Sequence, residues 1–412
     1  MTKMEREDRF LGYNQEKIQG MNRTLVLNLL RKGGICSRTQ LAKESGLKQA
    51  TITNIVNDFI EWGIVKETGF LTGDKGRRSI GISMDQSTFG ILAVRLARRG
   101  FSIGVFDMCG NPVKIIRRSA AQNQDPETVI SSIFKEAVEL MRDNSERHYL
   151  ACGIALPGPY SFKSGRIEIM TGTKGWHEIA IRERFEEALD MPVFVEQDAN
   201  AAAFAQYWKF EEEHPGEMLL YLAVGPGIGA GIIQKGQILR GRIGVAGEIG
   251  HMSVNYKGPK CVCGNRGCLE NYCSSRAFVD KVNRKKKALL SFEETAILLK
   301  EGDSDTEACF FEICDILAIA IANLMNCFNP SVIILGDEMS HIIPERMLSY
   351  IRGKVKDLVL PALYEDTLIS TSLLPIDSFV HGAAVVAWNQ IFTKPELYFN
   401  KYSEDEKKRL TR

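Results

Sequence analysis

The sequence lacks any apolar run that approaches the ~20 residues needed to cross a bilayer. Its first ten residues, MTKMEREDRF, contain no apolar core of a signal peptide. These two absences predict a cytoplasmic protein with no membrane association. Disorder and collagen-like structure are excluded because 44% of the residues are hydrophobic, 25% are charged, and Gly 36 and Pro 13 are ordinary counts. A chain of 412 residues has room for two or three domains of ~100–200 residues each.

Cysteine is scarce as well. Ten cysteines in 412 residues are too few for a disulfide scaffold, and four of them lie within residues 261–273. In a reducing compartment such a cluster favours a metal site over disulfides. Cys261, Cys263 and Cys268, together with His251, form the Cys₃His set that tetrahedral structural zinc prefers. We therefore expect one structural Zn²⁺ per chain, with free buried cysteines or an adventitious disulfide as the alternatives.

Neither sign of charge prevails over the whole chain, which has a net charge of +1. The distribution is uneven, however. Residues 1–85 contain 14 Lys and Arg against 10 Asp and Glu, and the remainder contains 38 against 41. A mildly basic head on a mildly acidic body weakly indicates that the head contacts phosphates.

Three helices are predicted in this head, over residues 14–31, 37–45 and 48–61. The turn near Gly46 and the polar face of the third helix are typical of a helix-turn-helix whose second helix enters the major groove. The apolar stripe of the third helix, which we expect to be buried, consists of Ile52, Ile55, Val56, Phe59 and Ile60. The polar residues largely off this stripe are the expected DNA contacts: Lys48, Gln49, Thr51, Thr53 and Asn54.

A basic hairpin is predicted directly after these helices. A short strand at residues 63–67 and a return strand through Ile80 and Ile82 enclose a basic tip at residues 73–78. This pattern is typical of a wing, whose Arg77 and Arg78 would reach the DNA backbone or the minor groove. It favours a winged helix-turn-helix over the alternative, a helical protein-interaction module. We expect a homodimer or homotetramer on double-stranded, palindromic operator DNA.

The body has a different pattern, in which apolar strands alternate with helices. A helix is predicted over residues 127–144, and glycine-rich turns follow several strands, as at 225–231. This alternation predicts an α/β architecture with a ligand cleft between lobes. The predicted strands are 90–94, 101–106, 150–155, 193–196, 218–224 and 332–335.

Three short segments of the body stand out: EQDAN at 196–200, GEIGH at 247–251 and CVCGNRGCLE at 261–270. They resemble motifs of the ROK family (repressors, open reading frames and sugar kinases), specifically its repressor branch, over residues 14 to about 390. The resemblance implies a two-lobed, actin-like (ribonuclease H-like) sugar-kinase fold behind a winged helix. It also implies zinc at the four residues identified above from their chemistry. The domains that it implies are 1–85 for DNA binding, 86–195 (completed by about 376–412) for the first lobe, and 196–375 for the second lobe with the zinc and sugar sites.

A sugar site is expected in the second lobe, because carboxylates and amides can bind hydroxyl groups at fixed spacing. In ROK kinases, the aspartate that matches Asp198 is the general base, and the residues that match Glu248, His251 and Glu270 hold the ring hydroxyls. Gln197 departs from the commoner asparagine of the family. The expected contacts to a sugar or sugar-phosphate effector are Gly158, Gln197, Asp198, Glu248, His251 and Glu270.

The phosphate-binding half of the family pattern is altered here. The Asp-x-Gly-Gly-Thr turn of ROK kinases falls at Arg95–Arg99, which contains no glycine and no acid. Pro226 stands where a threonine is usual, and Asp337 replaces the second glycine of a late Gly-Gly pair. Because phosphoryl transfer depends on positioned phosphate loops, we expect a protein that is not an enzyme: a sugar-responsive repressor of carbohydrate uptake or catabolism genes. The alternatives are an active ROK sugar kinase with a regulatory head, and a module that binds a transporter or signalling protein.

Overall fold

The computed structural model describes residues 15–72, 78–98, 100–119, 125–162, 164–167, 175–210, 217–375 and 377–399. The chain divides into two compact units, and each is described by itself. The first consists of Met1–Ile154, Gly172–Val195 and Ala383–Arg412, and the second of Ala155–Thr171 and Glu196–Gly382.

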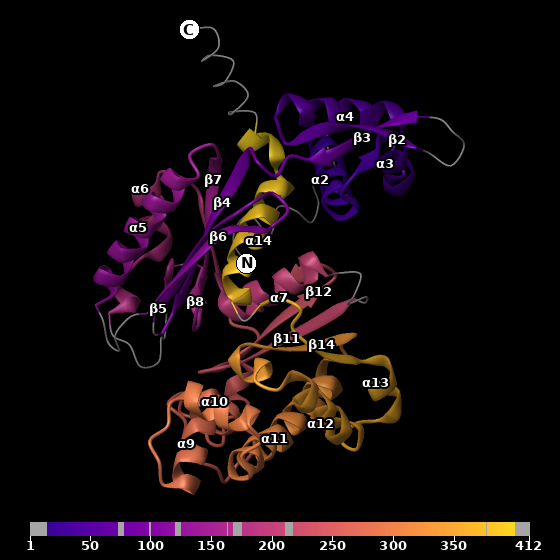
Figure 1. Ribbon diagram of the computed structural model, residues 1–412. Helices are drawn as coiled ribbons and strands as arrows, with labels where there is room; N and C mark the ends of the chain where they lie inside the picture. The colour runs from indigo at the N-terminus through magenta and orange to yellow at the C-terminus, as the bar shows by residue number, and fades with distance from the viewer. Residues whose placement is uncertain are drawn as a thin grey trace. The chain divides into compact units, whose positions relative to one another are not determined.

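The first unit begins with three helices and a small antiparallel sheet (Figure 1). Ser37 accepts a hydrogen bond from the backbone N–H of Gln40 and so caps the second helix, which Gly46 ends with φ 70°. The sheet has the strand order β1-β3-β2. The helices, close to the predicted ranges, are α2 (Gln15–Gly33), α3 (Arg38–Ser45) and α4 (Gln49–Glu61). The strands are β1 (Cys36–Ser37), β2 (Val65–Thr72) and β3 (Arg78–Met84).

The predicted burial of the α4 stripe is confirmed at four positions and wrong at the fifth. Ile52, Ile55, Val56 and Phe59 are buried, but Ile60 is 38% exposed. A residue that follows Phe59 on a helix points about 100° away from it, which takes Ile60 off the buried face.

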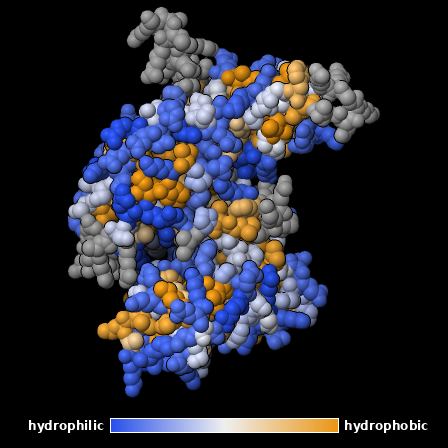
Figure 2. All heavy atoms as spheres, in the orientation of Figure 1, coloured by the Kyte–Doolittle hydropathy of each residue, from blue (hydrophilic) through white to orange (hydrophobic). Residues whose placement is uncertain are grey.

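The surface of the hairpin is partly apolar. Phe70 on β2 lies opposite Ile80 on β3, and both side chains are exposed. Figure 2 shows apolar surface over this end of the β2–β3 hairpin. The exposed face of this element is therefore mixed rather than uniformly polar.

The rest of the first unit is a five-stranded sheet of order β10-β7-β4-β5-β6. Helices α5 and α6 lie on one face of it and α14 on the other (Figure 1). Gly153 on β7 permits the approach of α14, because a Cβ there would lie 2.0 Å from the carbonyl oxygen of Ala383. The strands are β4 (Phe89–Ala97), β5 (Gly100–Phe106), β6 (Pro112–Ser119), β7 (His148–Leu156) and β10 (Val193–Gln197). The helices are α5 (Pro126–Asp143), η1 (Trp176–Glu178), α6 (Ile181–Leu189) and α14 (Ser378–Thr393).

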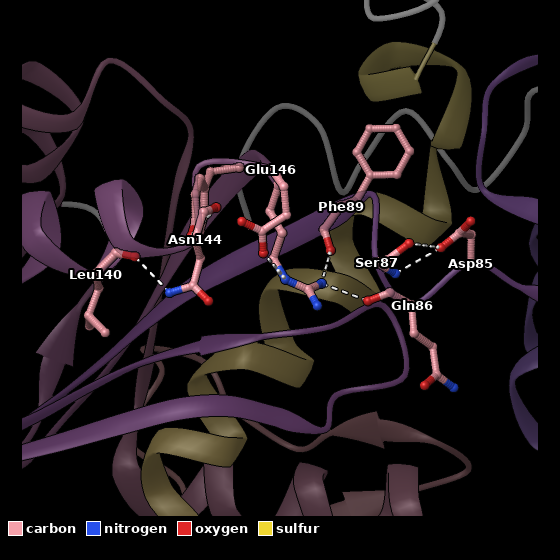
Figure 3. A network of polar contacts seen from close by, with 9 residues as sticks. Asp85, Gln86, Ser87, Phe89, Leu140, Asn144 and Glu146 are labelled. Carbon is pink, nitrogen blue, oxygen red and sulfur yellow. Dashed lines mark hydrogen bonds and ion pairs between the residues drawn. The ribbon is translucent and has the colours of Figure 1, made fainter.

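Polar contacts fix the connection between β3 and β4 (Figure 3). The guanidinium of Arg147 donates to the carbonyl oxygens of Gln86, at 2.6 Å, and Phe89, at 3.2 Å. Asp85 accepts hydrogen bonds from both the backbone N–H and the hydroxyl of Ser87. The connection is thus held by specific hydrogen bonds.

The C-terminal end of the described chain packs against the helical head. The Thr24 hydroxyl of α2 donates to the carbonyl oxygen of Phe392 at 2.8 Å. Phe399 is fully buried, stacks on Trp62 with 6.4 Å between ring centroids, and meets Phe89 edge-on at 5.1 Å. An aromatic cluster therefore joins the end of α4 to the beginning of β4.

The second unit is built on a sheet of order β13-β12-β11-β14-β15. Helix α7 lies close to β12, since a Cβ on Gly231 would be 2.2 Å from the carbonyl oxygen of Ala199. The strands are β11 (Met218–Val224), β12 (Ile228–Gln234), β13 (Gln237–Ile238), β14 (Val332–Gly336) and β15 (Leu368–Thr371), with a separate hairpin of β8 (Tyr160–Ser161) and β9 (Arg166–Ile167).

Helices complete the core of the second unit. Among the described helices, α11 alone is long and apolar enough to span a bilayer by length and composition. Its residues Phe310, Leu317 and Leu324 are buried in the core, so we interpret it as a core helix. The helices are α7 (Asp198–Lys209), η2 (Ile249–His251), α8 (Glu270–Cys273), α9 (Ser275–Lys286), α10 (Phe292–Lys300), α11 (Ser304–Phe328), η3 (Glu338–His341), α12 (Pro344–Lys356) and α13 (Pro361–Asp366).

Candidate ligand and metal site

Two glycines place the segment 247–251 directly against strand β12. A Cβ on Gly247 would lie 2.0 Å from the carbonyl oxygen of Ala230, and a Cβ on Gly250 would lie 2.2 Å from that of Ile228. Gly247 also has φ 97°, which L side chains rarely adopt. Any side chain at these positions would move the segment, so the glycines determine where its polar residues lie.

Three carboxyl groups gather around this segment. Asp198 begins α7, Glu248 precedes η2, and Glu270 begins α8. Glu270 accepts a hydrogen bond from the backbone N–H of Ile228 at 3.0 Å, which ties α8 to the start of β12. Burial raises the pKa of Glu248 to about 7, and the negative charges of Asp198 and Glu270 add to the effect. Near neutral pH Glu248 is therefore able both to donate and to accept hydrogen bonds.

A buried amide lies next to this cluster in the sequence. Gln197 is 6% exposed, and its Nε2 has no hydrogen-bond partner within the described part of the chain. An unsatisfied buried donor costs about 1–3 kcal/mol, which a ligand hydroxyl would offset. Gly158 lies in the turn after β7, where its φ of 80° favours glycine. No hydrogen bond between described residues joins Gly158 to the three carboxyl groups.

The four predicted metal ligands lie together. Their ligating atoms are all within 4.8 Å of one another. Cys263 Sγ is 3.7 Å from Cys268 Sγ, and Cys261 Sγ is 3.8 Å from His251 Nδ1. Tetrahedral zinc with bonds of ~2.0–2.3 Å separates its ligand atoms by roughly 3.3–3.8 Å. The cluster is therefore of a size and composition suited to zinc.

The pKa values of two of these thiols are shifted in opposite directions. The backbone N–H of Asn265 holds the pKa of Cys263 below its usual value, which favours the thiolate. Burial raises the pKa of Cys268 to about 12, so this thiol is protonated near neutral pH without a metal, and a bound metal would displace the proton.

The predicted DNA contacts lie at the start and on the open face of α4. Lys48 is the N-cap residue and is exposed, as are Gln49 and Asn54. Thr51 and Thr53 are half-buried, and the Thr53 hydroxyl donates to the carbonyl oxygen of Gln49 at 2.9 Å. Of the two predicted wing residues, Arg78 begins β3 and Arg77 lies outside the described residues.

The positions that match the first phosphate turn of the kinases lie in the β4–β5 hairpin. Ala97, near the end of this set of positions, pairs with Gly100 at the end of the hairpin. Arg95 lies before it on β4, opposite Ser102. Arg99 is outside the described residues.

Two further loops meet at one end of the second sheet. Strands β11 and β14 are parallel neighbours, with Ala223 opposite Gly336. Asp337, which follows β14, has φ 69° and ψ −177° and is 8% exposed. A Cβ on Gly225 would lie 2.0 Å from its Oδ2 atom. The Asp337 carboxylate thus packs directly against the glycine turn that follows β11.

Sequence reasoning missed Arg240, which connects several of these segments through its pairing with Glu196. The fully buried Glu196 accepts two hydrogen bonds from Arg240. Glu196 is part of a segment that stands out in the sequence, directly before Gln197. Arg240 belongs to no motif, and no pattern in the sequence signals its partner.

The chain is similar to known proteins both in sequence and in fold. The chain matches the ROK family over residues 91–389. It is 27% identical over 398 residues to the xylose repressor of Caldicellulosiruptor bescii, covering 93% of this chain and 99% of the repressor. It is 28% identical to the glucokinase of Thermotoga maritima, over 73% of this chain and 98% of the kinase. The crystal structure of a ROK family transcriptional regulator, a homologue of the E. coli MLC protein, superposes with a TM-score of 0.79 at 25% identity, covering 94% of this chain and 100% of the other.

Proposed function

The chain belongs to the ROK family, and we propose that it is a sugar-responsive transcriptional repressor that binds its sugar without phosphorylating it. The observation that carries the proposal is the group of three carboxyl residues, one of which directly follows Gln197, whose buried Nε2 has no hydrogen-bond partner among the described residues. Such a group is suited to hydroxyl-rich ligands. The relatives support the regulatory reading, because the xylose repressor matches the chain over nearly its whole length, head included.

Residues 1–85 form the DNA-binding domain, a winged helix-turn-helix. The second helix of the helix-turn-helix pair, α4, presents the exposed residues Gln49 and Asn54 and the N-cap Lys48 to a major groove. We assign Arg77 and Arg78 to the wing, where they would contact the DNA backbone or the minor groove. The target is a palindromic double-stranded operator in the cytoplasm, and two or four chains bind it, because one such module has too little affinity at physiological salt.

The sugar site belongs to residues 196–375, with a backbone contact from Gly158, which lies in the Ala155–Thr171 segment of the second unit. The rest of residues 86–195, completed by about 376–412, forms the other lobe. Asp198, Glu248 and Glu270 accept hydrogen bonds from sugar hydroxyls, and Gln197 donates one. The negative charges of Asp198 and Glu270 repel a phosphate, so a neutral sugar is favoured over a sugar phosphate.

Zinc has a structural role in this site. His251, Cys261, Cys263 and Cys268 would hold it, and it would supply a fixed positive centre that closes the loop. His251 faces the cluster through Nδ1, which leaves Nε2, on the other side of the imidazole, for a sugar hydroxyl. One side chain thereby ties the position of the metal loop to the ligand.

We expect no kinase activity because of Asp337. Its carboxylate packs against the Gly225 turn, where ROK kinases approach the nucleotide. A phosphate oxygen ~4 Å from this carboxylate would be repelled by about 4 kcal/mol at an effective dielectric constant of ~20. Pro226 beside it has no N–H to donate.

The sugar acts by stabilising one conformation. A ligand that binds the DNA-released state better than the DNA-bound state shifts the equilibrium toward release. The test is isothermal titration of wild-type protein with D-xylose, D-glucose and N-acetyl-D-glucosamine, alone and as phosphates. We expect one neutral sugar to bind. Binding of none, or of a phosphate alone, would contradict the proposed site.

A further inference from the structure

We propose that Arg240 is a positioning residue of the sugar site, and that its guanidinium holds together the three segments that carry the sugar contacts. These segments are the hairpin after Gly158, the junction of β10 and α7 that carries Gln197 and Asp198, and the loop that leads to Glu248. The inference rests on the proposed function, because its consequence is measured through sugar binding.

The first connection runs through a buried carboxylate. Glu196 is 0% exposed. Its Oε1 accepts hydrogen bonds from the backbone N–H of Gln197 and from Nδ2 of Asn200, both at 3.1 Å. Its Oε2 accepts from Nε of Arg240 at 3.0 Å and also from Nη2. A buried carboxylate requires such a partner, so Arg240 holds Glu196 in the position where it accepts the backbone N–H of Gln197.

The second connection runs through an aromatic ring. The guanidinium of Arg240 lies over the ring of Phe162, 5.6 Å from its centroid. Phe162 meets the buried Tyr160 edge-on, with 5.1 Å between centroids. Tyr160 is two residues beyond Gly158, so this packing connects the Gly158 turn to Arg240.

The third connection is the chain itself. Arg240 precedes the loop that runs to Glu248, and this loop folds onto the same ring. A Cβ on Gly244 would lie 2.9 Å from Phe162. Gly244 also has φ 90°, which L side chains rarely adopt. The loop and the hairpin thus share Phe162, and the β10–α7 junction joins them through Arg240.

These connections require an arginine. The planar guanidinium offers an edge with two N–H donors to Glu196 and a face to Phe162 at the same time. A lysine ammonium would neutralise Glu196 but would not present both surfaces. We therefore expect Arg240→Lys to retain more of the stability than of the sugar affinity.

The test measures affinity for D-xylose, D-glucose and N-acetyl-D-glucosamine by isothermal titration, together with chemical unfolding, in the full-length protein. We expect Arg240→Met to lower the affinity at least ~10-fold. Combining it with Glu196→Gln should recover part of this loss, because the double variant has no unpaired buried charge. A residue that only stabilises the fold would not produce such a recovery in affinity.

The matched control is Arg352→Met. Arg352 is also half-buried in the second unit, and its guanidinium donates through Nε and Nη2 to the carbonyl oxygen of Ile369 on β15. We expect this variant to lose stability and to bind sugar within twofold of wild type.

Two results would overturn the inference: sugar affinity in Arg240→Met equal to that of the Arg352→Met control, or no recovery in the double variant. Should Arg240→Met fail to fold, Arg240→Lys and Glu196→Gln give the same comparison, and unchanged affinity in both would refute the inference. If wild type binds no sugar of the panel, the proposed function itself fails and the inference fails with it. Equal sugar affinity in wild type and Arg240→Met would refute this inference and leave the proposed function standing.

Discussion

Phe399 offers a direct test of how the C-terminal segment supports the helical head. Its ring is fully buried between Trp62, at the end of α4, and Phe89, at the start of β4. Truncation of a buried phenylalanine to alanine costs about 3–5 kcal/mol. Phe399→Leu keeps most of the apolar volume and loses two aromatic pairs worth about 0.5–1.5 kcal/mol each. We expect Phe399→Leu to lower the free energy of unfolding by about 1–3 kcal/mol.

The part of the chain that loses stability in Phe399→Leu can also be predicted. Since Trp62 follows α4 directly, Phe399→Leu should accelerate amide hydrogen exchange in residues 49–62, because local opening of this region becomes easier. Phe310→Leu is the matched control, since Phe310 is fully buried, has Phe278 as an edge-on neighbour, and lies in the second unit. It should lower stability without changing exchange in residues 49–62.

A double-mutant cycle isolates the ring contact. Phe399→Leu and Trp62→Leu should couple by about 0.5–1.5 kcal/mol, the value of one aromatic pair. Additive effects of the two substitutions, or unchanged exchange in residues 49–62 in Phe399→Leu, would refute the reasoning.

Three further predictions concern the sites. Cys263→Ser should reduce the bound zinc, measured by atomic emission, and lower the free energy of unfolding by several kcal/mol, since structural zinc supplies ~10–16 kcal/mol in zinc-finger peptides. The control is Cys327→Ser, at an exposed cysteine, and unchanged zinc content in Cys263→Ser would contradict the ligand set. Asp198→Ala should weaken sugar binding at least ~10-fold, because a charged hydrogen-bond partner of the sugar is lost, while operator affinity stays within twofold of wild type. Loss of operator binding in this variant would contradict the separation of the sugar site from the DNA-binding domain. Wild-type protein should form no ADP from ATP above background with any sugar of the panel in a coupled assay, because Asp337 covers the Gly225 turn; sugar-dependent turnover would support the kinase alternative.

Local patterns predicted most of the elements and the metal cluster. The helices of the head follow from apolar spacing, and the Ser37 side chain caps α3. Cys261, Cys263 and Cys268 lie within one loop, so their proximity needs no knowledge of the fold. His251 joins them because Gly247 and Gly250 force its segment against β12.

Contacts between residues that lie far apart in the sequence could not be predicted from local patterns. Residues 391–412 have the composition of a loose tail or of a terminal helix against a partner, yet Phe399 is buried against Trp62, 337 positions earlier. The pairing of Arg240 with Glu196 likewise spans 44 positions. Neither leaves a periodic signal, because a single long-range contact occupies one position in each segment.

The most direct test of the central claim is a fluorescence-anisotropy titration of the protein with DNA from upstream of its own gene. It is run at ~150 mM salt, since protein–DNA affinity depends on ionic strength, and repeated with each sugar of the panel. The account predicts tight, sequence-specific binding that one neutral sugar weakens in wild type and not in Asp198→Ala. Specific binding that no sugar changes, or no specific binding at all, would contradict it.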